Sequence, residues 1–182
     1  MRLRILSTAS ILAIGLFVVG HRSSAQEAPP SQFEHISGLE PFVGFWQSDT
    51  PEEDGGPARL VCRLISNRSY LQMQLSMQVD SERETIATML IGKDHAKDQV
   101  AFWGFWADQQ TKGDNVEVGE GTAKWSEAGE MPGGGKSSAK VAMKVSGDEL
   151  TVDVTDVKKA GEDQPEMHIK FKRSQRGGRG GQ

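Results

Sequence analysis

The chain has 182 residues, of which 36% are hydrophobic and 25% charged, and its formal net charge is −4. This composition is typical of a single globular domain, and the acidic balance argues against nucleic acid as a general partner. The single cysteine, Cys62, excludes an intramolecular disulfide.

Residues 1–25 have the pattern of a signal peptide. Two arginines precede an uncharged apolar run over 5–20, and Ser23 and Ala25 are small residues at positions −3 and −1 of a cleavage site before Gln26. The run is shorter than the roughly 20 residues of a spanning helix, which favours cleavage over an uncleaved membrane anchor. Cleavage would leave 18 basic against 25 acidic residues. We expect a periplasmic or secreted protein with no transmembrane segment after cleavage.

The next segment predicts a mobile lead-in followed by a short helix. Residues 26–30 are polar and contain proline. Ser31 and Glu34 then have the spacing of a capping box, and an apolar stripe recurs every three residues, formed by Phe33, Ile36 and Leu39. We therefore expect a short helix over 31–40 that ends at Pro41.

From residue 42 onward the apolar period changes from three to two, which is typical of strands. The clearest case is 70–79, where Leu71, Met73, Leu75, Met77 and Val79 alternate with polar residues. About eight or nine strands are predicted, at 42–48, 58–66, 70–79, 84–92, 98–107, 115–126, 138–146, 150–157 and 166–173. Because no crossover helix separates them, the sheet should be antiparallel and meandering. Closure into a barrel would remove its edges, and an open β-sandwich is the alternative.

The predicted elements form one all-β domain over 31–173, followed by a tail over 174–182. The tail contains Arg-Gly-Gly repeats and too much glycine to pack, so it predicts disorder. Such repeats occur in RNA-binding segments, but on an acidic exported domain a solubilising or surface-adhering role is favoured. Within the domain, Cys62 is in phase with Leu60 and Leu64, which favours a buried thiol over a reactive nucleophile.

The first and last predicted strands carry a pair of residues with a specific pattern. Gly44-Phe45-Trp46 lies on the first strand, and Arg173 ends the last strand in phase with its apolar residues. This layout resembles the lipocalin-like proteins of the calycin superfamily, especially bacterial exported domains of unassigned role. The resemblance implies an up-and-down barrel whose closed end is covered by Trp46, with Arg173 packed over the indole and Gly44 beside them. An indole covers apolar surface, and a guanidinium stacks on its ring.

The resemblance also implies a small, largely apolar ligand inside the barrel, and residues in the interior phase are candidates to contact it. Phe102 and Trp106 share one face of an aromatic strand, and Trp103 and Phe105 share the other. The first face is either packed core or a ligand wall, and the predicted helix should cover the second. Methionines adapt to irregular space, so Met73, Met77 and Met89 are either core or ligand contacts.

The sequence contains few motifs that indicate catalysis or metal binding. His35, His95 and His168 have no ligand spacing, and the glycine-rich segment 131–137 fails as a phosphate loop because Glu130 occupies a required glycine position. We therefore expect no catalytic residue, no metal, no cofactor and no enzymatic activity. The sequence favours an exported binding module for a small apolar ligand or lipid. The alternative is a cell-envelope structural or interaction domain whose barrel is filled; protein partners stay open.

Overall fold

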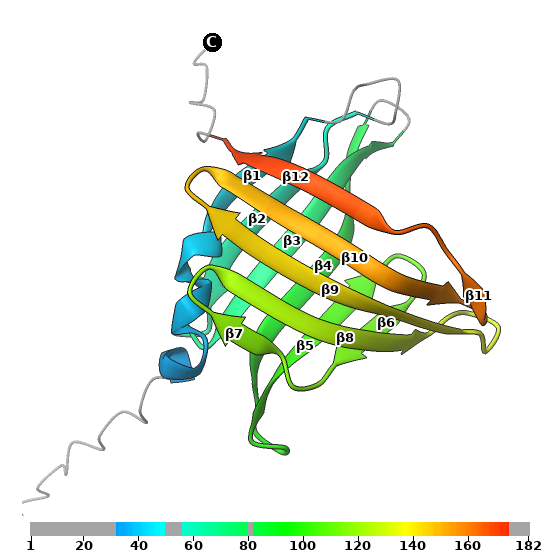
Figure 1. The fold of residues 1–182 in the computed structure, drawn as a ribbon, viewed down its shortest axis with the longest axis horizontal. Coiled ribbons are helices and arrows are strands. Elements are labelled where there is room, and N and C mark those ends of the chain that lie inside the picture. The colour runs from blue at the N-terminus through cyan, green and yellow to red at the C-terminus, as the bar shows by residue number, and fades with distance from the viewer. Residues whose placement is uncertain (1–31, 50–55, 80–81, 175–182) are drawn as a thin grey trace, which may run out of the picture.

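The computed structural model describes residues 32–49, 56–79 and 82–174. The predicted signal peptide over 1–25, the lead-in over 26–30 and residues 175–182 of the predicted tail lie outside the described residues. Figure 1 shows an all-β structure in which a single curved sheet closes on itself. Among the described residues, we find no helix with the length and apolarity needed to span a bilayer.

The described strands all pair in antiparallel fashion with their neighbours. They are β1 (Gly44–Ser48), β2 (Arg59–Ile65), β3 (Tyr70–Val79), β4 (Glu82–Asp94), β5 (Gln99–Trp106), β6 (Gln110–Gly113), β7 (Glu117–Gly119), β8 (Thr122–Glu130), β9 (Lys136–Ser146), β10 (Glu149–Lys159), β11 (Glu162–Asp163) and β12 (Met167–Arg173). Ten of them form the closed ring β1–β6, β8, β9, β10, β12, and β12 returns to pair with β1. β7 and β11 extend β8 and β10 outside the ring.

The expected fold class is therefore confirmed as an antiparallel all-β barrel, but the strand count of eight or nine was too low. The predicted strand over 115–126 is two strands, because Gly121 has a positive φ of 62° and the chain turns there between β7 and β8. Two short strands, β6 and β11, were missed because their sequences, QTKG and ED, have no apolar alternation. Their pairing depends on neighbouring strands rather than on local pattern.

The predicted helix over 31–40 is also wrong. The chain instead forms two 3₁₀ segments, η1 (Gln32–His35) and η2 (Ser37–Phe42), and Pro41 lies inside η2 rather than ending it. The residues Ile36, Leu39 and Phe42 are fully buried or nearly so. A spacing of three matches the three residues per turn of a 3₁₀ helix better than the 3.6 of an α-helix.

These two segments lie across one end of the barrel (Figure 1). η2 contacts β2, β7 and β8, and η1 contacts β4, so together they reach strands on different sides of the ring. Gly38 lets η2 approach β7 closely, since a Cβ there would lie 2.5 Å from the carbonyl oxygen of Gly119. We call this the closed end, and the end with the turns at 107–109, 131–135 and 160–166 the far end.

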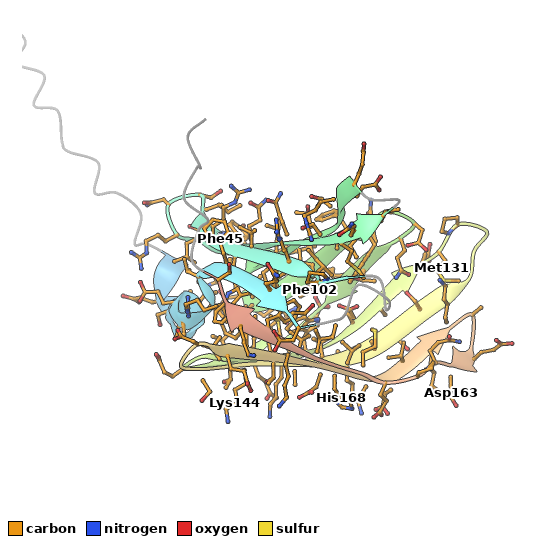
Figure 2. The ribbon with its side chains drawn as sticks, turned by 90° about the horizontal axis from the view of Figure 1, so that it is seen from above. Phe45, Phe102, Met131, Lys144, Asp163 and His168 are labelled. Carbon is orange, nitrogen blue, oxygen red and sulfur yellow. The ribbon has the colours of Figure 1, made fainter. Side chains whose placement is uncertain are left out.

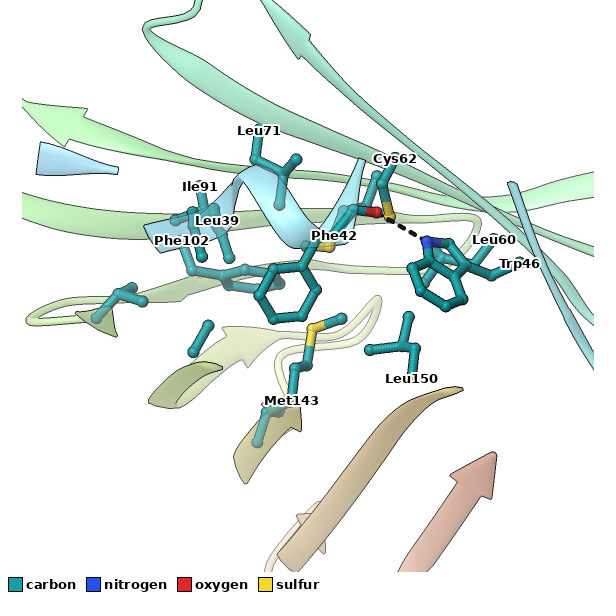
Figure 3. Packing of buried hydrophobic residues seen from close by; sticks show 14 of the residues in the cluster. Leu39, Phe42, Trp46, Leu60, Cys62, Leu71, Ile91, Phe102, Met143 and Leu150 are labelled. Carbon is teal, nitrogen blue, oxygen red and sulfur yellow. Dashed lines mark hydrogen bonds between the residues drawn. The ribbon is translucent and has the colours of Figure 1, made fainter. Parts of the chain in front are cut away.

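The hydrophobic core begins at the closed end. Figure 3 shows Leu39 and Phe42 of η2 packed beside side chains that point inward from several strands, including Trp46, Leu71, Phe102, Met143 and Leu150. Alternation along the strands puts these residues inside and most of the charged ones outside. In Figure 2, accordingly, Phe102 lies within the barrel while Lys144 and His168 lie on its outer surface.

Candidate functional site: an apolar cavity above a closed barrel end

Trp46 lies at the closed end, where it contacts both η2 and the last strand. Its indole Nε1 donates a hydrogen bond of 2.7 Å to the carbonyl oxygen of Phe42, and the side chain is almost completely buried. Trp46 pairs with Arg173 across β1 and β12, and the guanidinium carbon of Arg173 lies 4.1 Å from the centroid of the indole ring. This distance is well within the range of a cation–π contact.

The guanidinium of Arg173 also binds the chain that leads from η2 into β1. Its Nη1 donates to the carbonyl oxygen of Val43 at 2.8 Å, and its Nη2 donates to that of Pro41 at 3.0 Å. Gly44 leaves room for this group, because a Cβ at Gly44 would lie 2.6 Å from Nη1 and its φ is +149°. Arg173 therefore joins the start and the end of the barrel and satisfies two carbonyls at the end of a 3₁₀ helix.

A cavity of about 430 Å³ occupies the barrel beyond this closed end. All five residues proposed as ligand contacts lie on its wall, namely Met73, Met77, Met89, Phe102 and Trp106. None of the closure residues Gly44, Trp46 and Arg173 belongs to the lining. The structure thus places the two groups of predicted site residues in separate parts of the barrel.

The wall formed by β2 to β5 is apolar. Met73 and Met89 are directly opposite each other across β3 and β4, and Phe102 stacks on Trp125 with ring centroids 4.7 Å apart and an interplanar angle of 24°. Gly104 lies between Phe102 and Trp106 on β5, where a Cβ would lie 2.5 Å from the hydroxyl oxygen of Thr111. This space allows the Nε1 of Trp106 to reach that hydroxyl at 3.4 Å.

The part of the cavity wall formed by β6, β8 and β9 carries polar groups that the sequence pattern did not predict. Thr111 is on β6, Glu127 on β8 and Ser137 on β9, and the hydroxyl of Ser137 donates to the side-chain oxygen of Gln109 at 2.9 Å. Glu127 was missed because the predicted strand ended at residue 126. The signal that could have found it is its phase, since Glu127 follows the buried residues Ala123 and Trp125 at intervals of two.

Glu127 is the only acidic residue among the described residues of the lining. The Nε1 of Trp125 donates a hydrogen bond of 3.0 Å to its Oε2. Burial raises the pKa of the Glu127 carboxyl above its ordinary value, and the bond from Trp125 opposes this only in part. The neutral form of the carboxyl is therefore favoured more than it would be in water.

The N-terminal 3₁₀ segments do not cover the outer face of β5, so the expectation for the predicted helix was wrong. η1 and η2 lie across the closed end, and Phe105 is 42% exposed. Trp103 contacts other side chains of the outer surface instead: its ring centroid lies 6.3 Å from that of Tyr70, and the Nζ of Lys112 lies 5.7 Å from it. The reason is that the buried stripe of the 3₁₀ segments fits the open mouth of the ring, where apolar interior side chains would otherwise meet water.

Other reactive groups lie away from the cavity. Cys62 is buried, and burial raises the pKa of its thiol to about 12, although the charge of Arg173 acts in the opposite direction. His168 is exposed, and its Nδ1 lies 2.9 Å from Oδ1 of Asp153 on the outer surface. The described residues contain no group of three or more histidine, cysteine, aspartate or glutamate side chains placed to hold a metal ion.

No family model matches the chain, and no curated protein is similar to it at a significant level. The geometry of the barrel therefore carries the functional argument.

Proposed function

We propose that this protein binds a small, largely apolar molecule inside its barrel. The observation that supports the proposal is the cavity of about 430 Å³, whose wall is built mainly from methionine, aromatic and aliphatic side chains. Ligand sites typically occupy about 300–1,000 Å³ and are apolar, with a few polar groups that orient the ligand. An apolar ligand would be held chiefly by the apolar area that it removes from water.

Among the described residues, the lining of the cavity reaches solvent at the far end. Lys158 and Lys159 belong to its lining, and their side chains are 56% and 55% exposed. The closed end has no such residues, because η2 and the pair of Trp46 and Arg173 cover it. A ligand would thus enter at the far end and rest with its apolar part against Phe102 and Trp125.

We further propose a lipocalin-like barrel and export through the signal peptide predicted over 1–25. The lipocalin-like assignment is supported by the meandering antiparallel order of the ring and by the stacking of Arg173 on Trp46. Export is supported by the charge and hydrophobicity pattern of the N-terminal residues.

We propose no enzymatic role, because the polar groups of the lining are few beside its apolar ones.

The alternative was a filled barrel that acts as a structural or interaction domain. A barrel of about eight strands can be just wide enough for its side chains to fill it. The ring here has ten strands and encloses a cavity, which favours the binding function.

The direct test is titration of the purified mature protein with the fluorescent apolar probe N-phenyl-1-naphthylamine, followed by melting with and without a panel of lipids. We expect the probe emission to rise at a saturable site and at least one lipid to raise the melting temperature, because a ligand that binds only the native state stabilises it. The absence of both effects across a broad panel would overturn the proposal.

A cavity-filling variant locates the site. Ala139 of β9 lines the cavity, and Ala142 of the same strand faces the other way. Ala139→Leu should weaken probe binding by about tenfold or more, since extra methyl groups occupy ligand space or force repacking. Ala142→Leu is the matched control and should bind the probe like the wild type. Equal binding by both variants would place the probe elsewhere on the protein.

A further inference from the structure

Glu127 contributes a carboxyl group to a cavity lining that is otherwise mainly apolar. It lies on the inward face of β8, directly across from Ala139 of β9, and one layer beyond Trp125. Glu127 is half-buried, and taking a carboxylate out of water without a partner of opposite charge is costly. A charged side chain on this wall therefore requires an explanation that core packing does not provide.

Among the described residues, no lysine, arginine or histidine side chain forms an ion pair with the carboxyl of Glu127. Trp125 is the only hydrogen-bond donor to it among the described residues, and it contacts Oε2, so Oε1 accepts no hydrogen bond from those residues. The neighbouring polar side chains of the lining have partners of their own: Thr111 accepts from Trp106, and Ser137 donates to Gln109.

The two cations of the lining are directed elsewhere. The Nζ of Lys158 lies 3.4 Å from Oδ1 of Asp163, and the Nζ of Lys159 lies 3.9 Å from Oδ2 of Asp108; both aspartates are exposed. Burial raises the pKa of the Glu127 carboxyl, and the hydrogen bond from Trp125 lowers it. The positive charges at the far end are thus balanced outside the cavity, and the negative charge inside is not.

We propose that the ligand is an amphiphile with a basic nitrogen, whose protonated amine binds the carboxylate of Glu127 while its apolar part lies against the methionine and aromatic wall. This inference rests on the proposed function and adds the chemical class of the ligand. An ammonium supplies the missing charge and hydrogen-bond donors to Oε1, and hydrogen bonds between charged groups are roughly twice as strong as neutral ones. The Trp125 indole holds Oε2, so the carboxyl is oriented before the ligand arrives.

The test compares three molecules of equal chain length, dodecylamine, dodecan-1-ol and dodecanoate, as competitors of N-phenyl-1-naphthylamine at pH about 7.5 and below their micelle concentrations. We expect dodecylamine to bind about tenfold more tightly than the alcohol, because hydrogen bonds between charged groups are roughly twice as strong as neutral ones. Dodecanoate should bind weakest, because like charges repel. Each affinity is obtained from displacement of the probe.

Variants separate the role of Glu127 from the general attraction of an acidic protein for cations. Glu127→Gln keeps the shape of the side chain and should remove the preference, so that the amine and the alcohol bind alike. Glu130→Gln, on the exposed face of the same strand, makes the same charge change and should keep the preference. Melting curves check that both variants are folded.

The outcomes are distinct. A preference for the amine that is lost only in Glu127→Gln supports the inference. Binding of the alcohol or the acid at least as tightly as the amine, or a preference that survives in Glu127→Gln, overturns this inference and leaves the proposed function standing. Failure of the probe and all three competitors to bind overturns both.

Discussion

The guanidinium of Arg173 lies over the Trp46 ring with its central carbon 4.1 Å from the indole centroid, while its two terminal nitrogens donate to the carbonyls of Pro41 and Val43. The last strand, the first strand and the 3₁₀ segment before it therefore meet at one side chain. Because chain termini fray unless they are tied down, this contact is where the closure of the barrel should be most sensitive to mutation.

Truncation of the indole tests how much the closed end contributes to stability. We expect Trp46→Ala to lower the free energy of unfolding by about 3–5 kcal/mol, the cost of removing a large buried aromatic side chain. Phe45 is the matched control, since it is adjacent on β1 but 38% exposed, and Phe45→Ala should cost clearly less. Urea unfolding measures both. A Trp46→Ala protein with wild-type stability would show that the closed end does not depend on the indole.

The contribution of Arg173 beyond its charge is tested with Arg173→Lys. A lysine keeps the positive charge but cannot donate to two carbonyls in a planar fork while stacking on the ring. We expect a loss of about 1.5–3 kcal/mol in the free energy of unfolding. In a double-mutant cycle with Trp46→Ala, the two losses should add to more than the loss of the double variant, because the residues are in contact. Simple additivity would argue against the stacking contact.

The thiol of Cys62 should be inert in the native protein. With a pKa of about 12 it carries almost no thiolate near pH 8, and its side chain is buried under the closed end. We expect an aromatic disulfide reagent to label the native protein only as fast as the protein opens, and to label it rapidly in denaturant. Rapid labelling under native conditions would place Cys62 at an accessible position.

The raised pKa of Glu127 predicts a pH dependence of stability. The folded state holds this proton more tightly than the unfolded state does, so stability falls as the pH rises from the unfolded pKa, about 4.3 for glutamate, through the higher folded pKa. Glu127→Gln lacks this titration. Its stability relative to the wild type should therefore improve as the pH is raised, in unfolding curves recorded without ligand from pH about 3 to about 8.

The exposed residue Glu130 provides the control for that series. Glu130→Gln makes the same charge change on the exposed face of β8, so it measures the effect of removing a negative charge from this strand without changing the cavity. A stability difference for Glu127→Gln that stays constant over the whole pH range would show that the carboxyl is not perturbed by burial.

Much of the barrel could be predicted from local patterns. The period of two located β3 at its observed bounds, because one face of that strand is in the interior and the other is in water. β6 and β11 could not be found this way, because neither QTKG nor ED contains an apolar residue in alternation. These segments pair only because neighbouring strands are already in place. The apolar stripe of Ile36 and Leu39 could be recognised in the sequence. Whether this segment forms an α-helix or 3₁₀ turns depended on how it packs across the closed end of the barrel.

The sequence by itself determined the all-β class, the apolar interior phase and the positions of Trp46 and Arg173 at the two ends of the domain, because these follow from side-chain period and chain order. Only the tertiary structure decided that the ring has ten strands, that space remains inside it, and that Glu127 lines this space without an ion pair to any of the described residues. Those properties depend on strand register and on the summed volume of side chains from distant strands. The contact of Arg173 with Trp46 depends on both sequence and tertiary structure. The order of the two residues along the chain predicts it, and the pairing of β12 with β1 brings them together.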